Sequence, residues 1–521
     1  MRCIGFVLVV LLAASSAQEA RAQQAPAEVP AFDILEADIL QLQVAMGTGQ
    51  LTARALVDYY LARIAAFDGA GPRLNAMATL NGDARQVADA LDRERSEQGP
   101  RGSLHGIPLV IKDNYETIGM PTTAGSALLS DFQTHSDARQ VARLRTAGAI
   151  IIGKTNMHEF GYGITTVGSG FGATRNPYAT NRNPGGSSGG TGAAVAANFA
   201  AAGMGSDTCG SIRIPAAHNN LVGLRGTQGL SSRQGIIPLS HTQDIGGPLA
   251  RSVLDLALLL DATVGFDPRD PQTADSVGKI PASYATLLRP DALQGKRIGV
   301  LENLLLVGPE DKEVAAVIGQ ALNAMQALGA TVERVQMANF EELVNSRANG
   351  FLILTHDFKY DINAYLAEHV NAPVKSLAEI LRSGKFHPSV EDNLRVSEAM
   401  DDASEVAYLA ELQHRVVFRR EVVQLMAQGK LDALAYPTIR RKAALLGEPQ
   451  PGSNCRLSAN TGLPAISVPA GFTDDGLPVG LELLGGMWRE ADLLAMAYAL
   501  EQAIEVRRSP VLVASNEQDI W

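Results

Sequence analysis

Apolar residues recur at helical spacing in some stretches of the chain and form short unbroken runs in others. From Thr52 to Phe67 they return at every third or fourth position, which predicts a helix with one apolar face and with Thr52 as its cap. A second, highly charged helix is predicted around residues 83–97. The unbroken apolar runs are typical of strands that are buried on both faces.

A helix, a glycine and a buried strand follow one another several times. In SDARQVARLRTAGAIIIGKTN, residues 136–156, Ser136 is the expected helix cap and Gly148 the expected stop before the strand. The other predicted elements of this pattern are the helix 190–200 with the strand 201–205, the helix and strand within 314–332, and the strand 295–301. A region richer in helices follows, at residues 311–428.

This alternation of helices with short apolar strands predicts an α/β fold. We expect a large mixed sheet, largely parallel and twisted, with helices covering both faces. The sequence contains no internal repeat and no long low-complexity linker. Residues 33–521 are therefore predicted to form a single domain with a helical layer inserted on its surface.

The first 22 residues have the features of an export signal. Arg2 supplies a positive start, residues 4–14 an apolar stretch that is too short to cross a bilayer, and Ala20-Arg21-Ala22 a cleavage site. Cleavage after Ala17 fits nearly as well. Residues 23–32 are interpreted as a loose leader. We therefore predict a periplasmic or secreted protein that has no membrane contact once the signal is removed.

The composition fits a globular protein, since 46% of the residues are hydrophobic and 19% are charged. A formal net charge of −11 argues against nucleic acid as a partner, because phosphate binding requires a basic face. The basic run Arg440 to Lys442 is interpreted as a solvated loop. The nine histidines have no HxxxH or HExxH spacing and no CxxC occurs, so we expect no metal site and no cofactor.

Two serines lie in separate glycine-rich turns within residues 183–215, NPGGSSGGTGAAVAANFAAAGMGSDTCGSIRIP. Hydroxyls such as Ser187 and Ser211, surrounded by free backbone N–H groups, suit acyl-transfer chemistry. Upstream, GIPLVIKDN places Lys112 at the end of an apolar run. Burial lowers the pKa of a lysine and lets it act as a base. The alternative interpretation of Lys112 is an ordinary lysine at the end of a strand, whose side chain reaches water and has no catalytic role. Without an obvious histidine partner, the set suggests a hydrolase that uses lysine as its base.

Several ordered motifs resemble those of the amidase signature family. They are HGIPLVIKDN, AIIIGKTNMHEFGYG, GGSSGG, GSDTCGSIRIPA, LVGLRGTQG, GIIPLSHTQDIGGPLARSV and ISVPAGFTDDGLPVGLELLG. The resemblance begins at about Ile39 and covers nearly the whole mature chain. Within the family, the chain looks most similar to bacterial peptide-amidase-type members. The resemblance implies the amidase signature fold and an exported enzyme that hydrolyses the C–N bond of linear carboxylic amides.

The resemblance also implies roles for single residues. Lys112 would be the base, Ser187 the bridging serine and Ser211 the nucleophile that forms an acyl-enzyme. In this family the peptide bond before the bridging serine, here from Gly186, is cis. The backbone N–H groups of Thr208, Cys209, Gly210 and Ser211 would stabilise the oxyanion.

The residues beside the expected triad carry less weight. We interpret Ser188 as a hydrogen-bonding partner within the site or a plain turn serine. Asp207 and Arg213 are expected to form a structural ion pair or a capping set. His158 either lines the pocket or is an ordinary core or surface histidine.

Removal of the signal leaves two cysteines, Cys209 and Cys455. Two cysteines are not a disulfide framework, although export would allow one bridge. Cys209 lies in the expected oxyanion turn, where many family members carry glycine or aspartate. We therefore expect the two cysteines to remain unpaired.

The expected substrate is a small-molecule amide. Its predicted contacts are Met157, Tyr162 and Gly186. The stretches expected to build the pocket are residues 157–166, 349–365 and 436–454. Members of this family cleave peptide amides, fatty amides, anilides, and some esters or carbamates, and they occur as monomers and dimers. The sequence leaves both the substrate and the choice between monomer and homodimer open.

Other functional classes fit the sequence less well. The residues GGSSG match the G-x-S-x-G motif of α/β-hydrolases, with Ser187 as nucleophile and His241, His369 or His387 as base, but no buried strand precedes the motif. A phosphate-binding loop would require a GK[ST] ending. An export signal argues against the amidase component of a tRNA-dependent complex, and the three matching residues of the triad argue against a non-catalytic binding protein.

Overall fold

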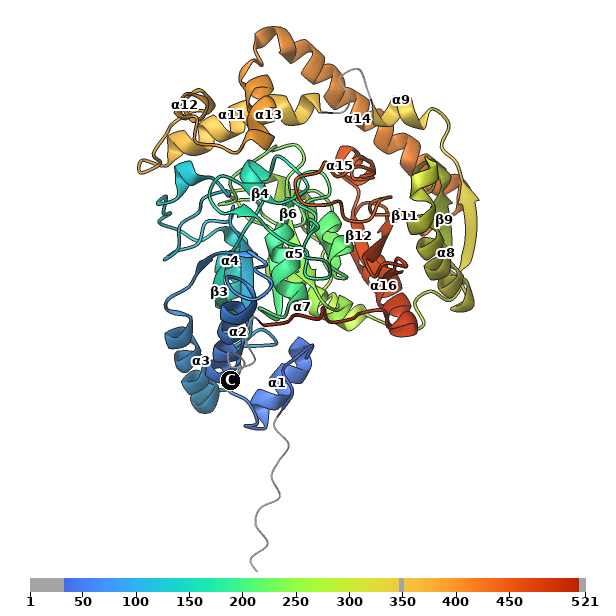
Figure 1. Cartoon of the computed structure of the whole chain (residues 1–521). Coiled ribbons are helices and arrows are strands. Elements are labelled where there is room, and N and C mark those ends of the chain that lie inside the picture. The colour runs from blue at the N-terminus through green and yellow to red at the C-terminus, as the bar shows by residue number, and fades with distance from the viewer. Residues whose placement is uncertain (1–31, 346–350, 515–521) are drawn as a thin grey trace, which may run out of the picture.

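The computed structural model describes residues 32–345 and 351–514 (Figure 1). The predicted export signal and most of the predicted leader lie outside these ranges. Within them, eleven strands form one sheet. Their order is β1 (Met77–Leu80), β3 (Ile150–Thr155), β2 (Pro108–Lys112), β6 (Ala202–Asp207), β8 (Ile245–Ala250), β7 (Val222–Arg225), β12 (Ala465–Phe472), β13 (Pro478–Leu484), β11 (Ala433–Pro437), β9 (Arg297–Leu301) and β10 (Thr331–Val335).

The predicted α/β class and the large mixed sheet are confirmed. Parallel pairing is found in two groups, β3–β2–β6 and β11–β9–β10. The strands from β6 through β8, β7, β12 and β13 to β11 pair antiparallel, as does β1 with β3. Parallel pairs are therefore fewer than expected, because antiparallel neighbours such as β12 and β13 need only a short turn, which periodicity alone does not reveal.

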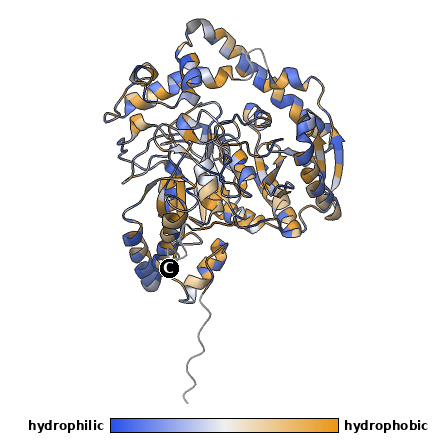
Figure 2. Cartoon of the chain, in the orientation of Figure 1, coloured by the Kyte–Doolittle hydropathy of each residue, from blue (hydrophilic) through white to orange (hydrophobic). Residues whose placement is uncertain are grey.

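Helices cover both faces of the sheet. A side chain at Gly205 in β6 would meet Ser188 at the start of α5, whereas one at Gly246 in β8 would meet Gln140 of α4. The helices around the sheet are α1 (Ile39–Gly47), α2 (Ala53–Phe67), α3 (Ala84–Gln98), α4 (Arg139–Thr146), α5 (Gly189–Ala196), α6 (Arg213–His218), α7 (Val253–Thr263), α8 (Lys312–Ala327), α15 (Arg456–Thr461) and α16 (Glu490–Ile504). In Figure 2, α3 is largely hydrophilic, in keeping with its peripheral place.

The sequence signals for helix ends had mixed success. The hydroxyl of Thr52 accepts the N–H of Ala55 at the start of α2, so this predicted cap is confirmed. Ser136 as the cap of α4 was wrong: the helix begins at Arg139, and the Ser136 hydroxyl donates to Glu116 instead. Gly148 follows α4 with a φ of +87°, a left-handed conformation that favours glycine and ends the helix as predicted.

A second layer of helices arches over one end of the sheet, at the top of Figure 1. It consists of α9 (Phe340–Val344), α11 (Leu352–Glu368), α12 (Leu377–Ser383), α13 (Pro388–Glu398) and α14 (Asp402–Gly429). Phe358 of α11 packs against Phe160 and Tyr162, which lie in the loop after β3. This layer, which the sequence predicted, therefore covers the loops at the end of the sheet. The hairpin β4 (Val167–Gly168) and β5 (Gly172–Ala173) lies beneath it.

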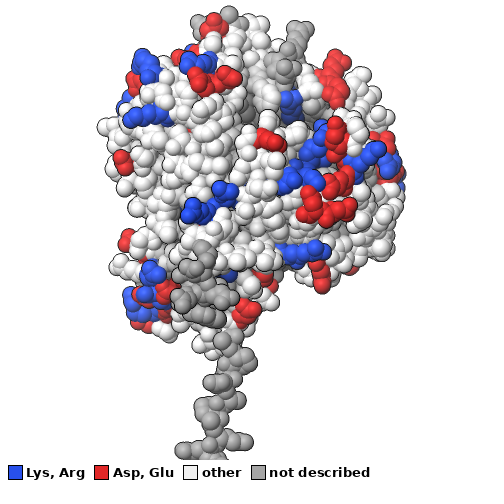
Figure 3. Space-filling model, viewed as in Figure 1, with Lys and Arg blue, Asp and Glu red and all other residues white. Residues whose placement is uncertain are grey.

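Basic and acidic side chains lie beside one another on the face shown in Figure 3. In the run Arg440 to Lys442, Arg441 pairs with Glu310 at 3.1 Å and Lys442 with Asp475 at 2.8 Å. The basic run is thus part of an ion-pair network. None of the helices in the described ranges has the length and apolar character needed to cross a membrane.

Candidate active site

Lys112 is the last residue of β2, and its side chain is fully buried. Its Nζ lies 2.7 Å from Ser187 Oγ and 2.8 Å from Ser206 Oγ. Asn114 also donates to the Ser206 hydroxyl, at 3.0 Å. The strand is buried along its whole length, so the amine is held in the interior and does not reach water.

Burial also sets the charge of this amine. Removal from water lowers the pKa of Lys112 from 10.5 to about 7, although the carboxylates of Asp244 and Asp207 partly oppose the shift. A large fraction of Lys112 is therefore neutral near physiological pH and can accept a proton.

Ser187 lies in the loop that leads into α5. The peptide bond between Gly186 and Ser187 is cis, as the resemblance implied. The Ser187 carbonyl accepts the N–H of His158 at 3.1 Å. Gly185 has a φ of +78° and lies so close to α6 that an added Cβ would be 3.0 Å from the Pro215 nitrogen. The close approach explains why this turn is rich in glycine.

Ser211 lies in the turn between β6 and α6 and faces a pocket. Its carbonyl accepts the N–H of Ser188 at 3.2 Å, and the Ser188 hydroxyl donates to the Ser206 carbonyl at 3.2 Å. These bonds join the two serine turns. In the described chain, the hydroxyls of Ser187 and Ser211 do not hydrogen-bond to each other; catalytic hydrogen bonds are often long in ligand-free sites and tighten with substrate.

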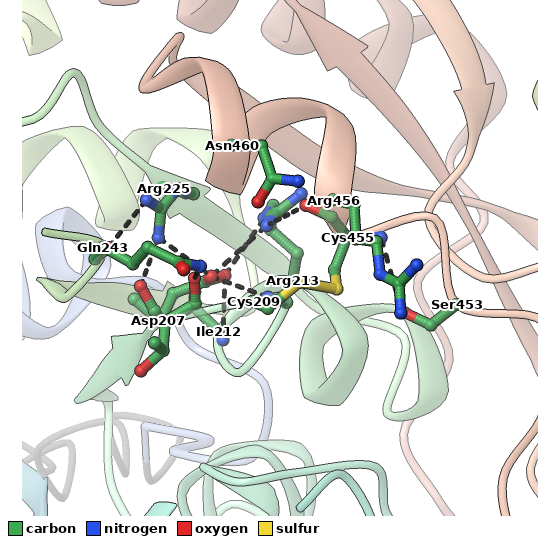
Figure 4. The surroundings of a disulfide bond; sticks show 12 residues. Asp207, Cys209, Ile212, Arg213, Arg225, Gln243, Ser453, Cys455, Arg456 and Asn460 are labelled. Atoms are coloured by element: carbon green, nitrogen blue, oxygen red, sulfur yellow. Dashed lines mark hydrogen bonds and ion pairs between the residues drawn. A yellow bond between two sulfur atoms is a disulfide. The ribbon is translucent and has the colours of Figure 1, made fainter. Parts of the chain in front are cut away.

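A buried carboxylate holds the turn that carries Ser211. Asp207 accepts the N–H of Gly210 at 2.7 Å and that of Ile212 at 3.2 Å. Arg213 and Arg225 pair with the same carboxylate at 3.0 and 3.1 Å and keep the pKa of Asp207 well below its usual range against the opposing effect of burial (Figure 4). The expected structural ion pair of Asp207 with Arg213 is confirmed. Arg225 was missed, because only the fold brings β7 to this turn.

The expected oxyanion donors are not equivalent. Gly210 already donates its N–H to Asp207. Thr208 is held by its hydroxyl, which donates to Asp244 at 2.6 Å. Over the ranges that the structure describes, the N–H groups of Thr208, Cys209 and Ser211 have no acceptor within the chain. These three amides, unlike that of Gly210, are therefore available as donors for a developing oxyanion.

The two cysteines form a disulfide, so the expectation that they stay unpaired was wrong (Figure 4). Cys209 and Cys455 are separated by 246 positions, yet their Cα atoms lie 5.0 Å apart. The loop before α15 packs directly against the nucleophile turn: a Cβ on Gly210 would lie 2.9 Å from that of Cys455. Local sequence contains no signal for this long-range contact.

The pocket beside Ser211 has a volume of about 600 Å³. Its lining is mainly apolar and includes Ile164, Leu239, Leu304, Phe340, Val344, Leu354 and Leu457. Each of the three stretches predicted to build the pocket contributes to it. Residues 303–307, 340–345 and 455–457 also line it and were missed, because α9 and α15 reach the site only through long-range packing.

Of the three predicted substrate contacts, Tyr162 lines the pocket, whereas Met157 and Gly186 do not. Tyr162 lines the pocket, and its hydroxyl lies 2.7 Å from Ser397 Oγ of α13. Met157 is fully buried, next to Gly125, and is not among the lining residues. Gly186 lies behind the pocket, where a Cβ would be 2.8 Å from the carbonyl carbon of Ile164.

The histidines of the G-x-S-x-G alternative lie elsewhere. His241 bonds to Asp361 at 2.9 Å, and His369 pairs with Glu116 at 2.9 Å. The ring of His387 contacts Ser389 at 2.8 Å. None of the three has a hydrogen bond to Ser187 among the described residues. The geometry therefore favours Lys112 as the partner of this serine.

His158 lies closer to the site than these three histidines. Burial lowers the pKa of His158 to about 3, helped by the nearby His387 and Lys112. Its ring nitrogens lie 3.4 Å from the Thr165 hydroxyl and 3.3 Å from that of Ser389. It is therefore a neutral, hydrogen-bonded core histidine at physiological pH.

Outside this site, the side chains of His241, Asp357 and Asp361 lie close together. Each offers one atom that could bind a metal ion, and these three atoms lie within 4.8 Å of one another. Asp357 accepts hydrogen bonds from Ser240 and Tyr408, and Asp361 accepts the ring N–H of His241. The group is an ion-paired junction between the loop before β8 and α11.

The chain belongs to the amidase family, whose model matches residues 55–494. The resemblance to the amidase signature family is thus confirmed, and the protein is an amidohydrolase that acts on C–N bonds.

Individual relatives are similar over most of their length. The structure of the native peptide amidase from Stenotrophomonas maltophilia is 39% identical with a TM-score of 0.84, and the match covers 91% of this chain and 98% of that one. A glutamyl-tRNA(Gln) amidotransferase subunit from Moorella thermoacetica is 38% identical, over 86% of this chain and 93% of the relative. A probable amidase of Arabidopsis thaliana is 33% identical, over 93% of each.

Proposed function

We propose that the protein is an exported amidase that removes the C-terminal amide of short peptides. The catalytic part rests on the fully buried amine of Lys112, which lies 2.7 Å from Ser187 Oγ. A backbone hydrogen bond joins the Ser187 turn to the turn of Ser211, which lines the pocket. Similarity to a peptide amidase supports the substrate class. A pocket of about 600 Å³ with a mainly apolar lining is in the size range that accommodates a short peptide.

In the proposed mechanism, neutral Lys112 takes a proton from Ser187, which takes one from Ser211. The Ser211 oxygen attacks the amide carbonyl, and the N–H groups of Cys209 and Ser211 stabilise the oxyanion. The tetrahedral intermediate collapses to an acyl-enzyme, and the proton returns through the relay to the leaving ammonia. Water then attacks the acyl group by the same relay, which releases the peptide acid and regenerates Ser211.

Export is supported by two independent features. Residues 1–22 have the charge and apolar pattern of a cleavable signal. The Cys209–Cys455 disulfide suits an oxidising compartment, since disulfides are rare in reducing cytosol.

A second candidate is the glutamine-hydrolysing component of a tRNA-dependent amidotransferase, which the 38% identity to an amidotransferase component favours. Carbamate, anilide and ester hydrolysis by the same residues are further alternatives.

A substrate panel tests these functions. Mature protein is assayed on a dipeptide amide, the matching p-nitroanilide, methyl ester and carbamate, and on glutamine. We expect kcat/KM for the dipeptide amide to exceed that for glutamine at least about a hundredfold, because glutamine leaves most of the apolar pocket empty. Preference for glutamine would contradict the peptide-amidase proposal.

Mass analysis tests export. Protein recovered from a bacterial periplasm should give a chain that starts near residue 23, and retention of residues 1–22 in the cytoplasm would contradict export.

A further inference from the structure

We propose that the Cys209–Cys455 disulfide positions the oxyanion turn, so that breaking it slows the chemical step of the reaction. This inference rests on the proposed function of Ser211 as nucleophile and of the Cys209 amide as an oxyanion donor.

The disulfide is the anchor of one particular residue in the turn. Asp207, Thr208, Gly210 and Ile212 are all tied to the protein by hydrogen bonds of their own. Cys209 takes part in no hydrogen bond among the described residues, and its disulfide is the link that holds it. The one residue of the turn that lacks a hydrogen-bonded anchor is therefore the residue that is covalently tied.

The other end of the disulfide is firmly held. The Cys455 carbonyl accepts the N–H of Ala459 at 3.1 Å and lies 3.4 Å from a guanidinium nitrogen of Arg213. The preceding Asn454 donates to the carbonyls of Leu304 and Pro437 at 3.0 and 2.7 Å. Cys455 thus provides a fixed point to which the turn is attached.

Arg213 connects the same two segments without a covalent bond. Its guanidinium donates to the Asp207 carboxylate and to the Cys455 carbonyl (Figure 4). It also donates to Glu482 of β13. Loss of the disulfide would therefore leave the loop before α15 and the base of the turn in contact. What it would release is the pocket-facing part of the turn, at Cys209.

This position predicts an effect on kcat more than on substrate binding. The amide of Cys209 contributes only when negative charge develops on the carbonyl oxygen, so its misplacement weakens transition-state stabilisation. Removal of one oxyanion donor typically costs about a hundredfold or more in rate, so a loosened donor should cost about tenfold or more.

Both cysteines line the pocket, so a small reductant can reach the bond from there. A thiolate of a dithiol reagent attacks one cysteine sulfur and forms a mixed disulfide, with release of the other cysteine as a thiol. The second thiol of the reagent then closes a ring, which gives two free cysteines and the oxidised reagent. Oxidation with a disulfide reagent reverses the exchange.

The experiment compares oxidised protein, dithiol-reduced protein and the Cys209→Ser/Cys455→Ser variant on the best substrate of the panel. We expect kcat to fall about tenfold or more in both disulfide-free forms, with KM changed less than about threefold. Reoxidation should restore the wild type and leave the variant unchanged. All assays are run well below the unfolding temperature of each form, measured by calorimetry.

Two inhibitors separate positioning from a general loss of structure. A peptide aldehyde adds to Ser211 and places an oxyanion in the turn, whereas the matching peptide alcohol only fills the pocket. We expect the Ki of the aldehyde to rise by about the same factor as kcat/KM falls, with the Ki of the alcohol nearly unchanged. Equal weakening of both inhibitors would overturn the proposal, as would a kcat within twofold of wild type once mass analysis shows both thiols free. Failure of the proposed function would differ, because Ser211→Ala would then remain active in oxidised protein.

Discussion

Replacement of Ser211 by alanine should lower kcat by about five orders of magnitude, because loss of the nucleophile from a serine hydrolase removes the covalent route altogether. Folding should be unaffected, since the Ser211 carbonyl and not its hydroxyl joins the two serine turns. The measurement is the steady-state rate of amide hydrolysis by Ser211→Ala. A matched control is Ser383→Ala, which replaces the last serine of α12; its hydroxyl bonds only to nearby backbone groups, the carbonyl of Ile380 and the N–H of Lys385.

Mass spectrometry identifies the nucleophile independently of rates. An activated ester should acylate wild-type protein on the peptide that contains residue 211 and leave Ser211→Ala unmodified. A stable acyl group on Ser187, or full activity of Ser211→Ala together with loss of activity in His241→Ala, would contradict the assignment.

Replacement of Lys112 by methionine should lower kcat by about four orders of magnitude. Methionine fits the buried space but cannot accept a proton from Ser187, and general bases typically contribute up to about 10⁴-fold. Lys112→Arg should be as inactive, because a guanidinium keeps its proton in proteins. The same assay measures both variants.

Lys359→Met is the matched control for this prediction. Lys359 lies in α11 and donates to two backbone carbonyls, those of Glu398 and Met400. Replacement of Lys359 by methionine should leave kcat within about twofold of the wild-type value. Activity of Lys112→Met above about a tenth of wild type would contradict the role of this amine as the base.

Local features of the site could be predicted from the sequence. An apolar run before Lys112 indicated a buried strand, and the structure has one there. The glycine-rich turns around Ser187 and Ser211 reflect close backbone approaches, such as that of Gly185 to α6. Helices with caps and one apolar face, such as α2, were also recognisable. In each case neighbours in sequence supply the physical cause.

Long-range features could not be predicted in this way. The disulfide, the contribution of Arg225 to the Asp207 network and the pocket wall from α9 and α15 each join segments far apart in the chain. The hydroxyl of Ser136 bonds to Glu116, which competes with its capping of α4. Such contacts depend on how the sheet orders its strands, and periodicity contains no information on that order.

The pH dependence of kcat/KM tests the central claim, a buried amine that is neutral at physiological pH, most directly. Only unprotonated Lys112 can act as the base, so activity should be lost as pH falls through its pKa. Because burial lowers this pKa to about 7, log kcat/KM for an uncharged N-acetyl peptide amide should rise with unit slope below that pH and level off above it. A profile that keeps rising to about pH 10, as an ordinary lysine would give, or one that is flat from pH 5 to 9, would contradict the account.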